Sequence, residues 1–157
     1  MTRATALALN GPPAHLGEVL DFMRLVWAVD HALQRTSKRM KAALGVTGPQ
    51  RLVIRIVARF PGIPPGQIAR LLHVHPSTLT GILKRLERQG FIHRRLDPKD
   101  RRRAFVGITE RGRRIEAAGQ GIVEAAVQRV MSRTPRVNVE SARQLLTDLA
   151  AALGVED

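Results

Sequence analysis

The sequence STLTGILKRLERQGFIHRRLDPKDRRRAFVGITERG, residues 77–112, decides the fold. Apolar residues recur at helical spacing over residues 77–89, whereas residues 91–96 and 104–108 are short and rich in strand formers. Gly90 separates the helical segment from the first strand, and glycine is typical of the left-handed position that ends a helix. The pattern therefore predicts an amphipathic helix followed directly by a β-hairpin with a charged tip.

Most of the chain's positive charge lies in the same region. Residues 84–114 hold 12 Lys or Arg and 4 Asp or Glu, which is +8 of the formal net charge of +13. Residues 115–157 hold 4 basic and 6 acidic side chains. A basic excess concentrated on one segment is typical of a nucleic-acid-binding face, and the C-terminal segment is expected to lie away from it. Charge alone would also fit a ribosomal protein or a surface that docks on anionic membranes.

Three helices are predicted upstream. Two apolar stripes at helical spacing indicate a long helix over residues 14–44. The segment Thr47-Gly48-Pro49-Gln50 has the spacing of a capping box, so a second helix should begin there and run to Phe60. After the Pro- and Gly-rich break at residues 61–66, a short helix is expected over residues 67–72.

Two more helices are predicted downstream of the hairpin. Thr109 is a good N-cap for a helix whose apolar positions continue to Val130. After a break at Thr134-Pro135, Asn138 is expected to cap the last helix, residues 139–153. The predicted order is four helices, a hairpin and two helices.

A short helix, a tight turn, an amphipathic helix and a basic hairpin form the winged helix-turn-helix arrangement. The predicted fold class is therefore mainly α with a small β-hairpin wing, and the winged helix-turn-helix lobe spans residues 47–109. Residues 1–13 are expected to form a disordered arm. The apolar run within this arm is too short for a signal-peptide core.

The helix over residues 77–89 carries the first set of candidate DNA contacts. A helix in the major groove needs small hydrogen-bonding side chains near its N-terminus and cations where it passes phosphates. The candidates are Ser77, Thr78, Thr80, Lys84, Arg85 and Arg88. Basic outer faces also occur on ordinary surface helices, but the adjoining basic hairpin favours the DNA-binding interpretation.

The hairpin carries the second set. Its candidates are Arg94, Arg95, Lys99, Asp100, Arg101, Arg102 and Arg103. The narrow minor groove concentrates negative potential, and an Arg held in position by an Asp can enter it. The tripeptide Asp100-Arg101-Arg102 offers this geometry, although a solvated charged turn is the alternative.

Residues 97–112 resemble the wing signature of the MarR family of bacterial and archaeal transcription regulators, in which Asp-x-Arg precedes Val-x-Leu/Ile-Thr and a Gly. Residues 76–80 and 83–92 are similar to the recognition helix of that family and its exit. Two positions depart from the family pattern. Gly81 stands where relatives often carry Arg or another long side chain, and His75 stands at the usual Ser N-cap position.

The resemblance implies a homodimer in which the N-terminal and the two C-terminal helices interlock, so that residues 14–46 and 110–157 form a helical dimerisation region. It implies that Asp100 orients Arg102 for the minor groove and that the helix from Ser77 enters the major groove of a pseudo-palindromic operator in double-stranded DNA. It also implies release from DNA by a small aromatic or anionic effector. The sequence does not identify the residues that would bind this effector.

Other functions lack support in the sequence. The chain has no cysteine, which removes disulfides, thiolate metal ligands and cysteine nucleophiles. His73 and His75 have no acidic neighbour that would complete a metal site, so no metal and no cofactor are expected. No Gly-rich phosphate loop or cluster of catalytic groups appears, and an enzyme is not expected. We expect a cytoplasmic protein without a membrane partner. The alternative to a specific regulator is a basic architectural or RNA-binding protein without sequence preference.

Overall fold

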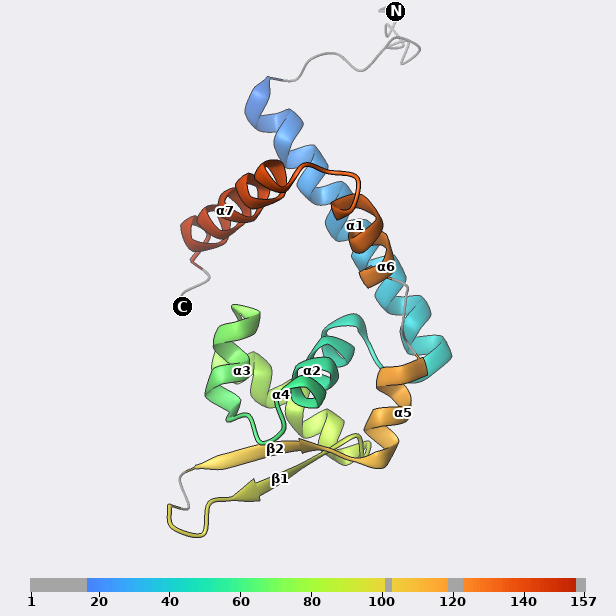
Figure 1. Cartoon of the computed structure of the whole chain (residues 1–157), viewed down its shortest axis with the longest axis vertical. Helices are drawn as coiled ribbons and strands as arrows, with labels where there is room; N and C mark the ends of the chain where they lie inside the picture. Colours follow the sequence, from blue (N-terminus) through green and yellow to red (C-terminus); the bar gives the residue numbers. More distant parts are fainter. Residues whose placement is uncertain (1–16, 101–102, 119–122, 155–157) are drawn as a thin grey trace, which may run out of the picture.

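The computed structural model describes residues 17–100, 103–118 and 123–154 (Figure 1). Its elements run in the order α1 (Glu18–Leu44), α2 (Gly48–Arg59), α3 (Pro65–Leu72), α4 (Pro76–Arg88), β1 (Ile92–Leu96), β2 (Ala104–Ile108), α5 (Glu110–Ala118), α6 (Val123–Met131) and α7 (Arg136–Ala152). The predicted fold class, mainly α with a small hairpin, is confirmed. The expected arm at residues 1–13 lies outside the described residues.

The start of α2 shows how local sequence fixes the beginning of a helix. Thr47 Oγ1 accepts a hydrogen bond from the Gln50 backbone N–H at 3.4 Å, and Gln50 Oε1 accepts one from the Thr47 N–H at 2.9 Å. Both donors belong to the first turn, where the helix supplies no partner of its own. The predicted capping box is therefore confirmed.

One compact core holds α2, α3, α4 and the hairpin together. The side chains packed inside it are Val46, Val53, Ile54, Val57, Ile63, Ile68, Ala69, Leu79, Leu83, Leu86, Phe91, Ile92, Val106 and Ile108. Leu79, Leu83 and Leu86 recur at helical spacing, so α4 buries one face and leaves the opposite face exposed. The core fixes the position of α4 in the lobe.

The base of the hairpin is attached to this core through Ile92, Val106 and Ile108. β1 and β2 pair antiparallel, with Ile92 opposite Ile108 and Arg94 opposite Val106. Ile63 forms an additional antiparallel bridge to Val106, with the Val106 N–H donating to the Ile63 carbonyl at 3.1 Å. These bonds anchor the base of the hairpin beside the loop that precedes α3.

Several helices begin at other residues than the sequence pattern predicts. α3 begins at Pro65 and α4 at Pro76, because proline tolerates the first helical position, where its missing N–H is not needed. α7 begins at Arg136 after Pro135, so the prediction that Asn138 is the N-cap is wrong. The Asn138 N–H already donates to the Pro135 carbonyl at 3.0 Å, inside the first turn.

α5 packs against the lobe, whereas α6, α7 and the first part of α1 extend away from it (Figure 1). The hairpin and the start of α1 lie at opposite ends of the molecule. Large apolar side chains remain exposed on α1, among them Trp27 at 66% and Val29 at 60%. The described parts of α6 and α7 contain no buried residue. The lobe thus has its own core, whereas α1, α6 and α7 leave apolar surface uncovered in the single chain.

Candidate nucleic-acid interface

The exposed face of α4 carries every helix residue selected from the sequence. Ser77, Thr78, Thr80, Lys84, Arg85 and Arg88 are all exposed. The Thr80 hydroxyl donates to the Pro76 carbonyl at 2.8 Å, which holds its oxygen against the helix. Hydroxyl groups therefore lie near the N-terminus of the helix and cations lie farther along it, on one continuous surface.

His75 caps this helix with its ring. The Ser77 backbone N–H donates to His75 Nδ1 at 3.2 Å, and the Ser77 hydroxyl oxygen lies 2.7 Å from the same nitrogen. A ring nitrogen that accepts the backbone N–H does the work that a Ser or Asp side chain does at other N-caps. His75 therefore supplies the cap despite its departure from the family pattern.

The hairpin tip is held by turn hydrogen bonds. The Lys99 N–H donates to Asp97 Oδ1 at 2.8 Å, and the Asp97 N–H donates to the Arg103 carbonyl at 2.9 Å. Arg95, Lys99 and Asp100 are exposed, and Arg103 lies with its Nε 3.7 Å from Asp100 Oδ2. Arg101 and Arg102 lie outside the described residues, so the orientation of Arg102 by Asp100 stays a prediction.

Arg94 is in a different environment from the other arginines of the wing. Its Nε lies 3.4 Å from Glu87 Oε2, and its side chain is only partly exposed. Glu87 is on α4, so this ion pair joins β1 to the helix that carries the first set of candidates. The structure thus gives Arg94 a contact that helps hold the wing against α4.

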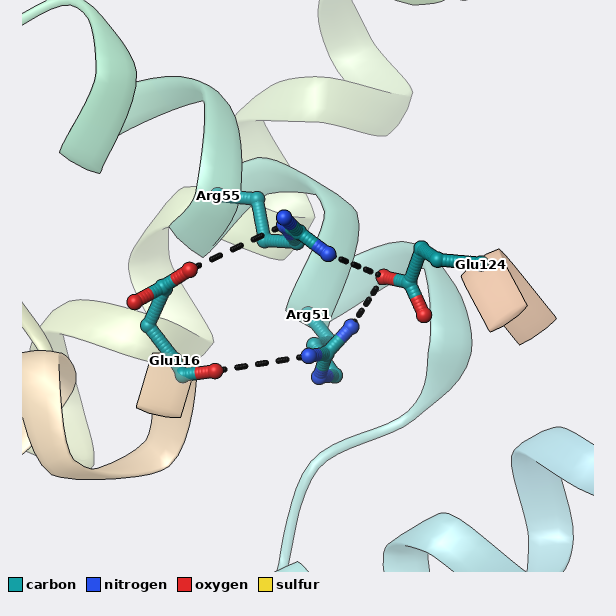
Figure 2. A network of polar contacts seen from close by, with 4 residues as sticks. All are labelled: Arg51, Arg55, Glu116 and Glu124. Carbon is teal, nitrogen blue, oxygen red and sulfur yellow. Dashed lines mark hydrogen bonds and ion pairs between the residues drawn. The ribbon is translucent and has the colours of Figure 1, made fainter. Parts of the chain in front are cut away.

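The sequence pattern missed a group of charged side chains at the junction between the lobe and the C-terminal helices (Figure 2). The Arg51 side chain on α2 is only 2% exposed and forms an ion pair with Glu124 on α6. Arg55, one turn farther along α2, donates to the same Glu124 oxygen at 2.9 Å, and its Nε lies 3.8 Å from Glu116 Oε1 on α5. The partners of Arg51 and Arg55 lie about 70 positions away in the sequence. The only local indication of them is the presence of two arginines four residues apart on an apolar helix.

The charge state of Glu124 follows from these contacts. Burial of its carboxyl raises the pKa, but a backbone hydrogen bond at Glu124 and the guanidinium groups of Arg55 and Arg51 outweigh burial and hold the pKa below its ordinary value. A carboxylate with a lowered pKa is ionised at neutral pH. Its contribution to stability is present above the ordinary pKa and is lost as the pH falls through the lowered value.

Within residues 17–100, 103–118 and 123–154, no three His, Asp or Glu side chains form a group that could hold a metal ion. In the same part of the chain, no helix combines the length and apolar character that crossing a membrane requires.

A helix-turn-helix followed by a basic β-hairpin defines the winged helix-turn-helix class. The family model named MarR family matches residues 46–104. Transcriptional regulator HosA of Escherichia coli O111:H- is 30% identical over 119 residues, which cover 76% of this chain and 88% of HosA. The chain therefore belongs to the MarR family.

Two further comparisons agree with this assignment. HTH-type transcriptional repressor Rv2887 of Mycobacterium tuberculosis is 25% identical over 81% of this chain and 91% of its own length. The crystal structure of the transcriptional regulator SlyA superposes with a TM-score of 0.70 at 26% identity, over 85% of this chain and 94% of SlyA. The similarity covers the long helices as well as the lobe.

Proposed function

We propose that this chain is a homodimeric, sequence-specific DNA-binding transcriptional regulator that acts as a repressor in the cytoplasm and has no enzymatic activity. The observation that carries the proposal is the continuous exposed face of α4, with hydroxyls followed by Lys84, Arg85 and Arg88, beside a basic hairpin that shares the same core. The names of HosA and Rv2887 support regulation, and the name of Rv2887 supports repression.

The proposed division of labour follows the elements. Residues 47–109 form the DNA-binding lobe, and residues 14–46 and 110–157 form the dimerisation region. The exposed apolar side chains of α1, α6 and α7 support this assignment, because contiguous apolar surface on a soluble protein marks an interaction site. In the dimer, two copies of α4 would enter successive major grooves of a pseudo-palindromic operator.

The ratio of specific to non-specific binding tests the proposal. We expect the purified protein to select a pseudo-palindrome from random duplexes, with half-sites about 10 bp apart. It should bind that site about a thousandfold or more tighter than a scrambled duplex at the same salt concentration. Equal affinity for both duplexes, or tighter binding to RNA, would instead support a basic architectural or RNA-binding protein.

Arg102→Ala is expected to weaken binding to the selected operator by about tenfold or more, since a good groove contact is worth about 1–3 kcal/mol. The loss should be greatest for operators with A·T-rich flanks, whose narrow minor groove attracts Arg. Arg133→Ala, which removes a positive charge near the end of α6, is the control and should change affinity little. Fluorescence anisotropy with both duplexes measures the effect, and an equal loss in the two variants would contradict the wing assignment.

An effector site is part of the proposal. A cavity of about 630 Å³ lies between α1, α2, α4, α6 and the end of α3, and Leu33, Leu52, Leu72 and Ile82 supply apolar walls. Arg51 and Glu124 also line it. This composition suits a small molecule with an apolar body and one polar or anionic group. A thermal-shift screen of aromatic acids is the experiment that tests for such a ligand.

A further inference from the structure

The DNA-binding lobe is joined to the C-terminal helices by four charged residues, which we call the junction network: Arg51, Arg55, Glu116 and Glu124 (Figure 2). Arg51 and Arg55 converge on one Glu124 carboxylate oxygen. Arg51 also donates to the Glu116 backbone carbonyl at 3.3 Å. α2 is thereby bound both to α5, which leaves the hairpin, and to α6, which follows it.

The junction network differs from an ordinary surface ion pair because part of it is buried. The Arg51 side chain is 2% exposed, and Glu124 Oε2 is also inaccessible, although the Glu124 side chain as a whole is 38% exposed. A buried ion pair adds little net stability, because desolvation of two charges offsets their attraction. It does require a fixed geometry, since moving Glu124 away would leave the buried Arg51 charge without its carboxylate partner. The network therefore favours one orientation of α6 on α2 over its neighbours.

The end of α1 is packed on the lobe through the buried Met40 and a hydrogen bond from the Gly48 N–H to Ser37 Oγ at 2.8 Å. Among the described residues, α6 has little comparable contact with the lobe outside the junction network. The core of the lobe includes no residue of the described parts of α6 or α7. α6 has no buried side chain among its described residues. The position of the lobe relative to α6 thus depends strongly on the contacts of Glu124.

From these contacts we infer that the junction network sets the angle between each lobe and the C-terminal helices of the dimerisation region, and so selects the half-site spacing that the dimer accepts. The inference rests on the proposed function. Two recognition helices related by a two-fold axis can enter successive major grooves only at a fixed separation, about one helical turn. Because the two-fold axis repeats any change of angle in both lobes, the two changes add in the distance between the recognition helices.

Removing both charges while keeping the volume tests this role. The double variant Arg51→Met/Glu124→Leu replaces the buried Arg51 and the half-buried Glu124 with apolar side chains, a change that commonly preserves folding. We expect wild-type protein to prefer its best spacing over spacings shifted by about 2 bp by about tenfold or more, and the double variant to reduce this preference to about threefold or less. The melting temperature and the dimer, followed by sedimentation, should be retained.

The matched control is Glu110→Gln/Arg114→Met, which removes an exposed ion pair within α5 that joins no two elements. This control should keep the wild-type spacing preference. The milder variant Arg55→Met/Glu116→Gln changes the partly exposed half of the network, and it should give an intermediate loss even where the Arg51 variant folds poorly. The readout is a set of duplexes whose half-site separation runs from about 8 to about 12 bp around one turn.

The outcomes separate this inference from the function on which it rests. Wild-type protein that binds every spacing and scrambled DNA alike would overturn both. Wild-type protein with a sharp preference, together with network variants that keep it, would overturn the inference alone. A loss of preference in the network variants, with the control unchanged, supports it.

Discussion

Replacement of Gly112 by alanine is expected to lower the free energy of unfolding by about 3 kcal/mol or more, at the upper end of overpacking effects. Gly112 is buried in the first turn of α5. A Cβ at this position would overlap the Phe91 carbonyl oxygen and lie 2.8 Å from Ile108 Cγ1. The obstacle is backbone, which cannot move aside as the end of a flexible side chain can.

The Phe91 carbonyl is also held in place by hydrogen bonds. It accepts from the Thr109 backbone N–H and from the Thr109 hydroxyl, both at 3.1 Å. The same hydroxyl oxygen accepts from the Gly112 N–H at 3.0 Å. Moving α5 away from Phe91 would weaken these bonds, each worth about 1 kcal/mol net. The junction of β1, β2 and α5 should therefore loosen as a unit.

Urea unfolding measures this effect, with Gly81→Ala as the matched control. Gly81 is also helical, but a Cβ there meets nothing within 4 Å. Alanine at that helix-interior position should stabilise the protein by up to about 1 kcal/mol. If Gly112→Ala were as stable as the wild type, the close approach of α5 to Phe91 would be wrong.

The parts of the fold that were predicted correctly have local causes. Thr47 and Gln50 are three residues apart, so their reciprocal bonds can be expected from sequence alone. The exposed face of α4 follows from the rotation of 100° per residue, because the buried leucines occupy the opposite side. These features need no knowledge of the rest of the chain.

The features that were missed depend on distant contacts. An arginine at position 51 has the same local pattern whether it faces water or Glu124, 73 positions away. The glycine at position 112 was recognised as part of a motif, but its physical reason is the carbonyl of Phe91 from another element. Arg94 stays a predicted DNA contact, but its ion pair with Glu87 becomes evident only when β1 packs beside α4.

The helices proposed for dimerisation show a third case, because their apolar stripes are predicted from the sequence but remain uncovered in the single chain. Leu145 and Leu146 on α7 are 50% and 55% exposed, and Val130 on α6 is 66% exposed. Leaving such side chains in water forfeits about 25 cal/mol for each Å² of apolar surface that could be buried. A second copy that covers α1, α6 and α7 would recover this free energy, which supports the proposal that these helices form the dimer interface.

Leu146→Glu is therefore expected to weaken the dimer by about 100-fold or more, or about 2.7 kcal/mol, because a carboxylate would have to be buried without a partner in an apolar interface. Sedimentation equilibrium should show monomers at concentrations where we expect the wild-type protein to be dimeric, and operator binding should lose its cooperativity. Gln144→Glu is the control: it introduces the same charge on the opposite side of α7, where the side chain is exposed. The lobe has its own core, so Leu146→Glu should keep hydrogen-exchange protection in α2 and α4 while losing it in α7. A variant that remains dimeric would show that this face of α7 lies outside the interface.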